Sequence, residues 1–362
     1  MTKKKRLIFS LLLLPIITFS QQIEVNFSSV DSFATTVKYK KDLNDLTQKL
    51  ASPYSEQLLK ARVIFKWITE NIRYDYKYYN KYNYKGKEPK TFKCKDDKQC
   101  EAKRIVWETK YIDKVLRKKK AVCQGYAMLL KKMCDIAGLK SEFIVGYIRT
   151  EPYQVGTAGI LDHAWNAVWI DSSYYLLDAT WAAGGCGKTE DGKLLFFQKH
   201  FNNYYWLTPP ESFVRNHYPQ PSKWTLLPNY TKDSFVTNPY YLPSEIQNIK
   251  LVTPASGIIA AKKGDTIRFK IEYNGYIKEL QINSNIFRNP DIWVFDKISK
   301  RKKVRRLDTL AVKRQQYIKY NLTGSLYDFQ YVVTDNSLYY LDILFDRQRI
   351  MRFKVTVDKK EQ

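Results

Sequence analysis

Two strings of sequence place the strongest constraint on what this chain can fold into. The first, AVCQGY around Cys123, precedes a long apolar run with helical spacing. The second, LDHAWNAVWIDSSYYLLDATW, carries His163 and Asp178 on two alternating runs that a short polar turn joins. A cysteine, a histidine and a carboxylate are the nucleophile, the base and the orienting group that cysteine-based acyl transfer needs. We therefore predict a helix that starts at Cys123, followed by strands that carry the other two residues.

The pattern of the strands indicates whether His163 and Asp178 can meet. If a two-residue turn joins their strands, Asp178 falls opposite Trp165 or Ala167, depending on which two residues form the turn. Both positions share a face with His163, because side chains alternate with a period of two along a strand. A carboxylate on that face can orient the imidazole. The predicted strands cover EFIVGYI (142–148), HAWNAVWI (163–170) and YYLLDATW (174–181).

The predicted placement has chemical consequences. The helix N-terminus at Cys123 and a protonated His163 would both favour the thiolate. His163 would later give its proton to the leaving amine, and Asp178 would fix the tautomer of the ring. The backbone N–H of Cys123 is the first candidate donor to the oxyanion, and spacing identifies no second one. Each residue also has a structural alternative: a small residue at a helix start, a satisfied imidazole, and a cap for the turn at Ala179.

Around these residues the chain resembles the transglutaminase-like superfamily, whose core is a papain-like cysteine fold with the order Cys, His, Asp. The segments KWITENIRYDY, AVCQGYAMLLKKMCDIAGLKSEFIVGY and DHAWNAVWIDSSYYLLDATWAAG look like its successive blocks. An aromatic-rich tail at 201–227 is similar to that of the kyphoscoliosis-peptidase-like branch. By this resemblance, Cys123 matches the nucleophile, His163 the base and Asp178 the orienting acid. It also implies an α+β core, with the cysteine helix packed on an antiparallel sheet.

The family contains protein crosslinkers, peptidases and inactive scaffolds, so the resemblance alone does not select a reaction. A Lys- and Tyr-rich insertion at about 75–103 departs from the family pattern. It has no strong periodicity, and we predict a surface loop that could cover or reshape the cleft. Calcium dependence belongs to the large animal crosslinking enzymes, and no acidic loop here favours it.

The N-terminus predicts export. Basic residues at 3–6 and the apolar stretch LIFSLLLLPIITFS are typical of a signal peptide over residues 1–20, cleaved near Ser20 and Gln21. The alternative is an uncleaved anchor. After cleavage we expect no transmembrane segment, and a secreted, periplasmic or cell-envelope protein.

The formal net charge of +25 would allow binding to anionic cell-envelope polymers. Only RKKVRR at 301–306 is a dense basic run, and dispersed lysines also serve solubility alone. Export and the lack of an accompanying motif argue against nucleic-acid binding.

The five cysteines differ in context. Cys94 and Cys100 could close a small disulfide loop, Cys134 is expected to be a buried core thiol, and Cys186 is free or paired. Neither cysteines nor histidines show the sequence spacing of metal ligands, so we predict no metal and no cofactor.

The C-terminal part changes character. Short strand-like runs predict an all-β, sandwich-like domain over residues 238–362, after a transglutaminase-like cysteine domain over 21–237. The runs are TIRFKIEY (266–273), DIWVFD (291–296), FQYVVT (329–334), YYLDILF (339–345) and RFKVTV (352–357). This domain contains no histidine or cysteine, so we do not expect it to carry catalysis.

Three functions of different class follow from these observations. The favoured one is an exported cysteine peptidase or protein-glutamine acyltransferase-like enzyme that acts on protein or peptide carbonyls by hydrolysis or transfer. The second is an inactive transglutaminase-like binding or scaffold protein. The third is a basic envelope adhesin.

Overall fold

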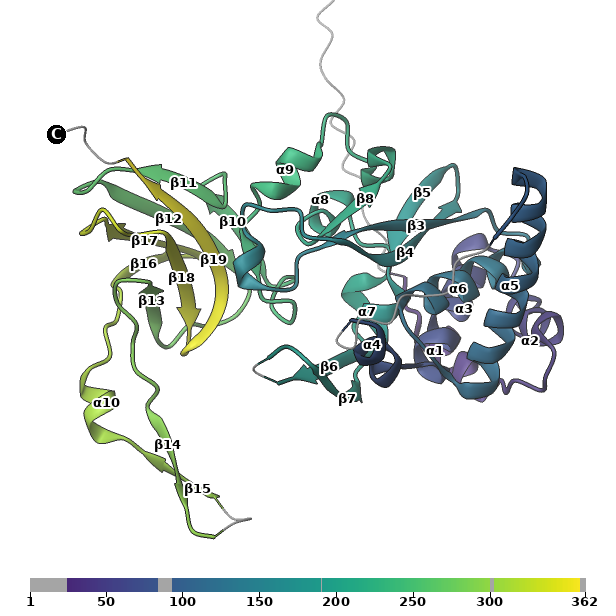
Figure 1. Ribbon diagram of the computed structural model, residues 1–362, viewed down its shortest axis with the longest axis horizontal. Coiled ribbons are helices and arrows are strands. Elements are labelled where there is room, and N and C mark those ends of the chain that lie inside the picture. Colours follow the sequence, from purple (N-terminus) through teal and green to yellow (C-terminus); the bar gives the residue numbers. More distant parts are fainter. Residues whose placement is uncertain (1–24, 84–92, 190, 300–302, 359–362) are drawn as a thin grey trace, which may run out of the picture.

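The computed structural model describes residues 25–83, 93–189, 191–299 and 303–358 (Figure 1). Helices and a four-stranded antiparallel sheet form most of the N-terminal part, and antiparallel strands form most of the C-terminal part, which confirms the α+β class. The predicted signal peptide lies outside the described residues. None of the helices in the described ranges combines the length and the hydropathy that crossing a bilayer requires.

The helix that starts at Cys123, α6, is central to the N-terminal part. It packs against α3 and on β3 and β4 of the sheet. It ends at Ile136, and Gly138 follows with a φ of 74°, the left-handed conformation that glycine adopts at helix ends. The main helices are α1 (Ser28–Thr36), α2 (Leu43–Ala51), α3 (Gln57–Asn71), α4 (Tyr76–Asn83), α5 (Asp97–Lys118), α6 (Cys123–Ile136) and α7 (Ala179–Ala183).

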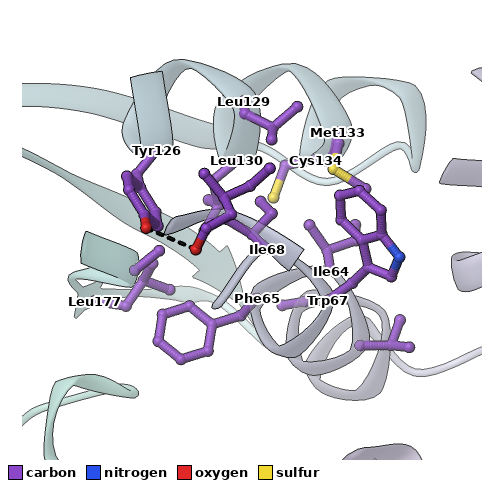
Figure 2. Close-up of a cluster of buried hydrophobic side chains, with 14 of the residues drawn as sticks. Ile64, Phe65, Trp67, Ile68, Tyr126, Leu129, Leu130, Met133, Cys134 and Leu177 are labelled. Atoms are coloured by element: carbon purple, nitrogen blue, oxygen red, sulfur yellow. Dashed lines mark hydrogen bonds between the residues drawn. The ribbon is translucent and has the colours of Figure 1, made fainter. Parts of the chain in front are cut away.

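The main core lies between α3 and α6, because both helices turn apolar residues toward each other. The Tyr126 hydroxyl donates to the carbonyl oxygen of Ile72 at 2.7 Å, so this buried phenol has a partner. As predicted, Cys134 is buried. Figure 2 shows the cluster, which includes Ile64, Phe65, Trp67, Ile68, Leu129, Leu130, Met133 and Cys134.

A four-stranded antiparallel sheet, in the order β5-β4-β3-β8, carries the candidate site. Asp171 and Ser172 form the two-residue turn between β4 and β5, with φ values of 43° and 75°. Positive φ at both positions is the geometry of turns that suit tight hairpins. The register pairs Asn166 with Leu177, which directs Asp178 toward the side of β4 that carries His163. The strands are β3 (Ser141–Ile148), β4 (Leu161–Ile170), β5 (Ser173–Leu177) and β8 (His217–Gln220).

The prediction of a loop at about 75–103 is wrong for the residues that the structure describes there. Helix α4 starts this segment and α5 ends it, and residues 84–92 lie outside the described part. Neither α4 nor α5 contains glycine or proline. The Asp96 side chain caps α5 by accepting from the backbone N–H of Gln99. Within α5, Arg104 forms ion pairs with Glu101 and Glu108. Local capping and charge pairs thus compensate for the weak hydrophobic pattern. A disulfide joins Cys94 and Cys100 at the start of α5.

Short elements connect these parts. A parallel pair, β1 with β2, places Tyr74 beside Ala121, just before Cys123. An antiparallel pair, β6 with β7, follows α7. The short elements are β1 (Arg73–Tyr74), β2 (Lys120–Ala121), β6 (Gly184–Lys188), β7 (Leu194–Lys199), α8 (Pro210–Phe213), α9 (Lys232–Val236), and three 3₁₀ turns at Pro152–Gln154, Asn203–Tyr205 and Ser222–Thr225.

Two sheets of the C-terminal part pack face to face on a second core. The ring of Phe269 in one sheet lies 5.2 Å from that of Phe353 in the other. One sheet has the order β10-β12-β17-β16, and the other has the order β11-β19-β18-β13, with β9 added on β19. The strands are β9 (Tyr240–Tyr241), β10 (Ile249–Thr253), β11 (Ile258–Ala261), β12 (Thr266–Tyr273), β13 (Leu280–Ser284), β16 (Tyr320–Thr323), β17 (Leu326–Val332), β18 (Tyr340–Phe345) and β19 (Gln348–Val357).

A separate hairpin, β14 (Trp293–Lys297) with β15 (Lys303–Leu307), and the short helix α10 (Thr309–Lys313) extend away from this sandwich (Figure 1). The domain boundary at 237 and 238 stays a prediction, and it falls between α9 and β9.

Candidate active site

Cys123 lies at the N-terminus of α6, where the sequence placed it. Its Sγ atom is 3.7 Å from the carbonyl oxygen of Asp162, the residue that precedes His163. The Cys123 sulfur is also among the groups that raise the pKa of the His163 ring. Cys123 and His163 both line one cleft.

His163 on β4 and Asp178 just after β5 form a buried pair. Nε2 of His163 lies 2.7 Å from Oδ2 of Asp178, and the two residues are 6% and 0% exposed. The other oxygen of Asp178 accepts from the backbone N–H groups of Thr180 at 2.7 Å and Trp181 at 3.1 Å, so Asp178 is also the N-cap of α7. These bonds fix the carboxylate, and the carboxylate fixes the ring.

Sequence reasoning missed a second histidine at this site. His217, at the start of β8, is fully buried, and its Nε2 atom lies 3.3 Å from the same Oδ2 atom of Asp178. Its ring stacks on Phe213 with centroids 4.2 Å apart. The available signal was composition: the chain has three histidines, and His217 follows the predicted sheet in an aromatic-rich segment. No motif or spacing connected it to Asp178.

The partners of His217 define its tautomer. A neutral imidazole has one N–H, and Asp178 can only accept, so that hydrogen lies on Nε2. Nδ1 lies 2.6 Å from Oδ1 of Asn216, which can only accept, so a neutral ring requires the amide to be turned until its nitrogen donates to Nδ1. In this orientation the amide oxygen of Asn216 can accept from the hydroxyl of Tyr205, a buried group that otherwise has no partner. This one orientation of the amide therefore gives hydrogen-bond partners to the His217 ring, the Asn216 amide and the Tyr205 hydroxyl.

The charges at this site are unequal. Burial alone would lower the pKa of His163, but the charge and hydrogen bond of Asp178, together with the Cys123 sulfur, raise it to about 10. Burial would raise the pKa of Asp178, but His163 and then His217 hold it well below its usual range. Burial, together with the charge of His163, lowers the pKa of His217 to about 4. At neutral pH the site therefore holds an imidazolium, a carboxylate and a neutral imidazole.

The cleft over Cys123 has a volume of about 630 Å³. The helices of the insertion, α4 and α5, form one wall of it, so the insertion shapes the cleft. Besides His163, the charged residues of the lining are Asp162 and Lys188. The aromatic residues that β1, α4 and α5 contribute to the lining are Tyr74, Tyr78, Tyr79, Tyr82, Trp107 and Tyr111.

Two further thiols are free within the described residues. Cys134 is buried in the core, and burial raises its pKa to about 12. Cys186 lines the same cleft as Cys123, and burial raises its pKa to about 11 against the opposing charge of Lys188. Cys186 is therefore a natural internal comparison for the reactivity of Cys123.

The ligand atoms of His163, Asp178 and His217 lie within 4.8 Å of one another, a grouping that could hold a metal ion. In this structure the contacts of Asp178 with the two rings have hydrogen-bond lengths, 2.7 Å and 3.3 Å. An ion would have to displace the proton that the raised pKa holds on His163. The donor set therefore fits a hydrogen-bond network better than a metal centre.

Comparison with known proteins identifies the class of the N-terminal part. Residues 41–184 match the family model of a transglutaminase-like domain, and the chain carries such a domain there. The resemblance predicted from the sequence is thus confirmed.

Two mammalian proteins are similar to this chain over a longer stretch than the family model. The chain is 30% identical to the kyphoscoliosis peptidase of Mus musculus over 242 residues, which cover 66% of this chain and 32% of that protein. The kyphoscoliosis peptidase of Homo sapiens matches at the same identity over 243 residues, with the same coverage of each chain. The chain thus spans about a third of the length of these relatives. A solved structure described as a crystal structure of a TGase aligns with a TM-score of 0.27 and 16% identity, over 52% of this chain and 40% of that one.

Proposed function

We propose that this protein is an exported cysteine enzyme that cleaves or transfers acyl groups at peptide or isopeptide carbonyls. The observation that carries the proposal is the buried His163–Asp178 pair, at 2.7 Å, beside Cys123 in one cleft. The name of the peptidase relatives supports the same class of chemistry.

In the proposed reaction, the Cys123 thiolate attacks the substrate carbonyl carbon and forms a carbon–sulfur bond. His163, whose Nε2 atom is engaged by Asp178, gives the proton of its other ring nitrogen to the departing amine. The thioester that remains is attacked by water or by a primary amine, and His163 accepts a proton from that nucleophile. The carbon–sulfur bond then breaks, which releases the product and returns Cys123 to the thiolate. Hydrolysis and transfer thus share every residue, and the second nucleophile decides between them.

Two donors are proposed for the oxyanion. The first is the backbone N–H of Cys123 at the start of α6. The second is the hydroxyl of Tyr74, which lines the cleft next to the strand that leads to Cys123. Burial, together with the charge of Cys123, raises the pKa of Tyr74 well above its usual range, so the hydroxyl keeps its proton.

The proposal is tested by trapping the acyl intermediate. The mature protein is mixed with candidate peptides, and mass spectrometry locates the adduct before and after water or a primary amine is added. We expect an adduct on Cys123 that the added nucleophile releases, and none in Cys123→Ala. An adduct on Cys186 or Cys134 instead would contradict the proposal.

A noncatalytic binding module with the same fold is the alternative. It predicts that no peptide forms an adduct and that Cys123→Ala retains every partner and phenotype.

A further inference from the structure

The β14–β15 hairpin stands apart from the other sheets of the C-terminal part. Its two strands pair only with each other in the described part of the chain, and Figure 1 shows them extending away from the sandwich. An isolated two-stranded hairpin is marginally stable in water unless one face packs on something. The hairpin also contains part of RKKVRR, the densest basic run, for which the proposed catalysis has no use.

The register of the hairpin separates its side chains into two unlike faces. Directly opposite residues share a face, and alternate pairs point the same way. One face therefore carries three cross-strand pairs, and we call it the basic-aromatic face. Its pairs are Trp293 with Leu307, Phe295 with Arg305, and Lys297 with Lys303.

The second face differs in its charge. It carries Val294, Asp296, Val304 and Arg306, and Arg306 donates to Asp296 at 2.8 Å. Its one cation is therefore balanced by its one carboxylate. The unbalanced charge of the described strands lies on the basic-aromatic face.

No carboxylate of the described residues lies within ion-pair distance of Lys297, Lys303 or Arg305. Lys297 and Lys303 lie directly opposite each other, an arrangement that costs stability unless an anion screens it. The guanidinium of Arg305 lies 3.7 Å from the ring centroid of Trp293, so it keeps an aromatic partner and its charge. Charge complementarity therefore favours an anionic partner.

Exposed apolar side chains accompany these cations. On the basic-aromatic face, Phe295 is 61% exposed and Leu307 is 41% exposed. Cations mixed with aromatic and aliphatic side chains are typical of segments that lie in the interfacial region of a bilayer. A hydrophilic polyanion would satisfy the cations but not the apolar groups. A second copy of the hairpin would bring like charges together.

We propose that the basic-aromatic face docks on the surface of a membrane that contains anionic phospholipid. Lys297, Lys303 and Arg305 would contact the headgroups, and Phe295 with Leu307 would enter the interface. This inference is independent of the proposed catalysis.

The test measures binding of the full-length mature protein to vesicles of phosphatidylcholine, with and without phosphatidylglycerol. We expect binding only to the anionic vesicles, and weaker binding as salt is raised. Replacing both Lys297 and Lys303 by Gln should lower the partition coefficient by about tenfold or more. Phe295→Ser should lower it by about tenfold.

Matched variants separate these effects from general changes in charge or folding. Lys297→Arg with Lys303→Arg keeps the charge and should bind like the wild type. Lys262→Gln with Lys263→Gln, at exposed positions between β11 and β12, should also leave binding unchanged. The melting temperature of each variant is measured alongside.

Three results would overturn the proposal. The first is no binding to anionic vesicles. The second is an equal loss in the Lys262 and Lys263 control. The third is an unchanged affinity of Phe295→Ser together with equally tight binding to dextran sulfate, which would identify a hydrophilic polyanion as the partner.

Discussion

Oδ2 of Asp178 lies 2.7 Å from Nε2 of His163, while Oδ1 of the same carboxylate caps helix α7. The two interpretations of Asp178 that the sequence allowed, an orienting acid and a structural cap, therefore both describe the same residue. Because the backbone of α7 holds one oxygen, the other stays fixed for the imidazole. The orientation of the His163 ring therefore depends on Asp178 as the N-cap of α7.

Asp178→Asn tests the orienting role. Asn can still accept from the α7 backbone, so we expect the fold to persist, but the charge that raises the pKa of His163 is lost. Turnover of a substrate found by trapping should fall by about 10³–10⁴-fold, the effect expected when a triad loses its orienting carboxylate. Asp162→Asn, which changes a cleft carboxylate on β4 next to His163, is the control. Its turnover of the same substrate should stay within about tenfold of the wild-type value.

His217 gives the stability of the protein a dependence on acid. Its pKa is about 4 when folded and about 6.5 when unfolded. Between these values the unfolded chain binds a proton that the folded site refuses, so this residue makes stability fall as pH drops from 6.5 toward 4. In His217→Gln, whose amide can still donate to Asp178, this part of the slope should vanish. Chemical denaturation at a series of pH values measures it.

His163 acts in the opposite direction. Its pKa is about 10 in the folded protein, above the unfolded value of about 6.5. The stability that its ion pair contributes is therefore complete below pH 6.5 and is lost as pH rises toward 10. His163→Gln should show a flatter stability profile over that alkaline range, and an unchanged slope would contradict the raised pKa.

Tyr74→Phe tests the second oxyanion donor. Removing the hydroxyl should lower kcat by about 10²–10³-fold with little change in KM, because the hydrogen bond forms to the developing charge. Tyr111→Phe, which removes another hydroxyl of the cleft, is the matched control. Equal effects of the two variants would mean that Tyr74 has no special role.

The sequence predicted those parts of the molecule that depend on local pattern. The helix from Cys123, the strand of His163 and the two-residue turn all follow from periodicity and turn chemistry, so their residues could be located in advance. The strand predicted over 174–181 is wrong beyond Leu177, because Asp178 caps helix α7. Strand β12 was predicted with its observed ends, Thr266 and Tyr273, because its residues, TIRFKIEY, alternate between polar and apolar types.

Features that depend on distant parts of the chain were not predicted. His217 reaches Asp178 because β8 pairs with β3, and a four-residue strand has too little pattern to reveal its neighbour. The helices α4 and α5 were missed because their stability comes from caps, charge pairs and packing over the cleft rather than from an apolar stripe. Strands β10, β11, β13 and β16 are only four or five residues long, and no turn motif marked them.

The most direct test of the central claim compares the alkylation of two cysteines in the same cleft. Iodoacetamide is added to the mature protein near neutral pH, and mass spectrometry follows Cys123 and Cys186 separately. Cys123, which lines the cleft with the His163 imidazolium, should react far faster than Cys186, whose pKa is raised to about 11, and His163→Ala should lower the rate at Cys123. Equal rates in the wild type, or a rate at Cys123 that His163→Ala leaves unchanged, would contradict the account.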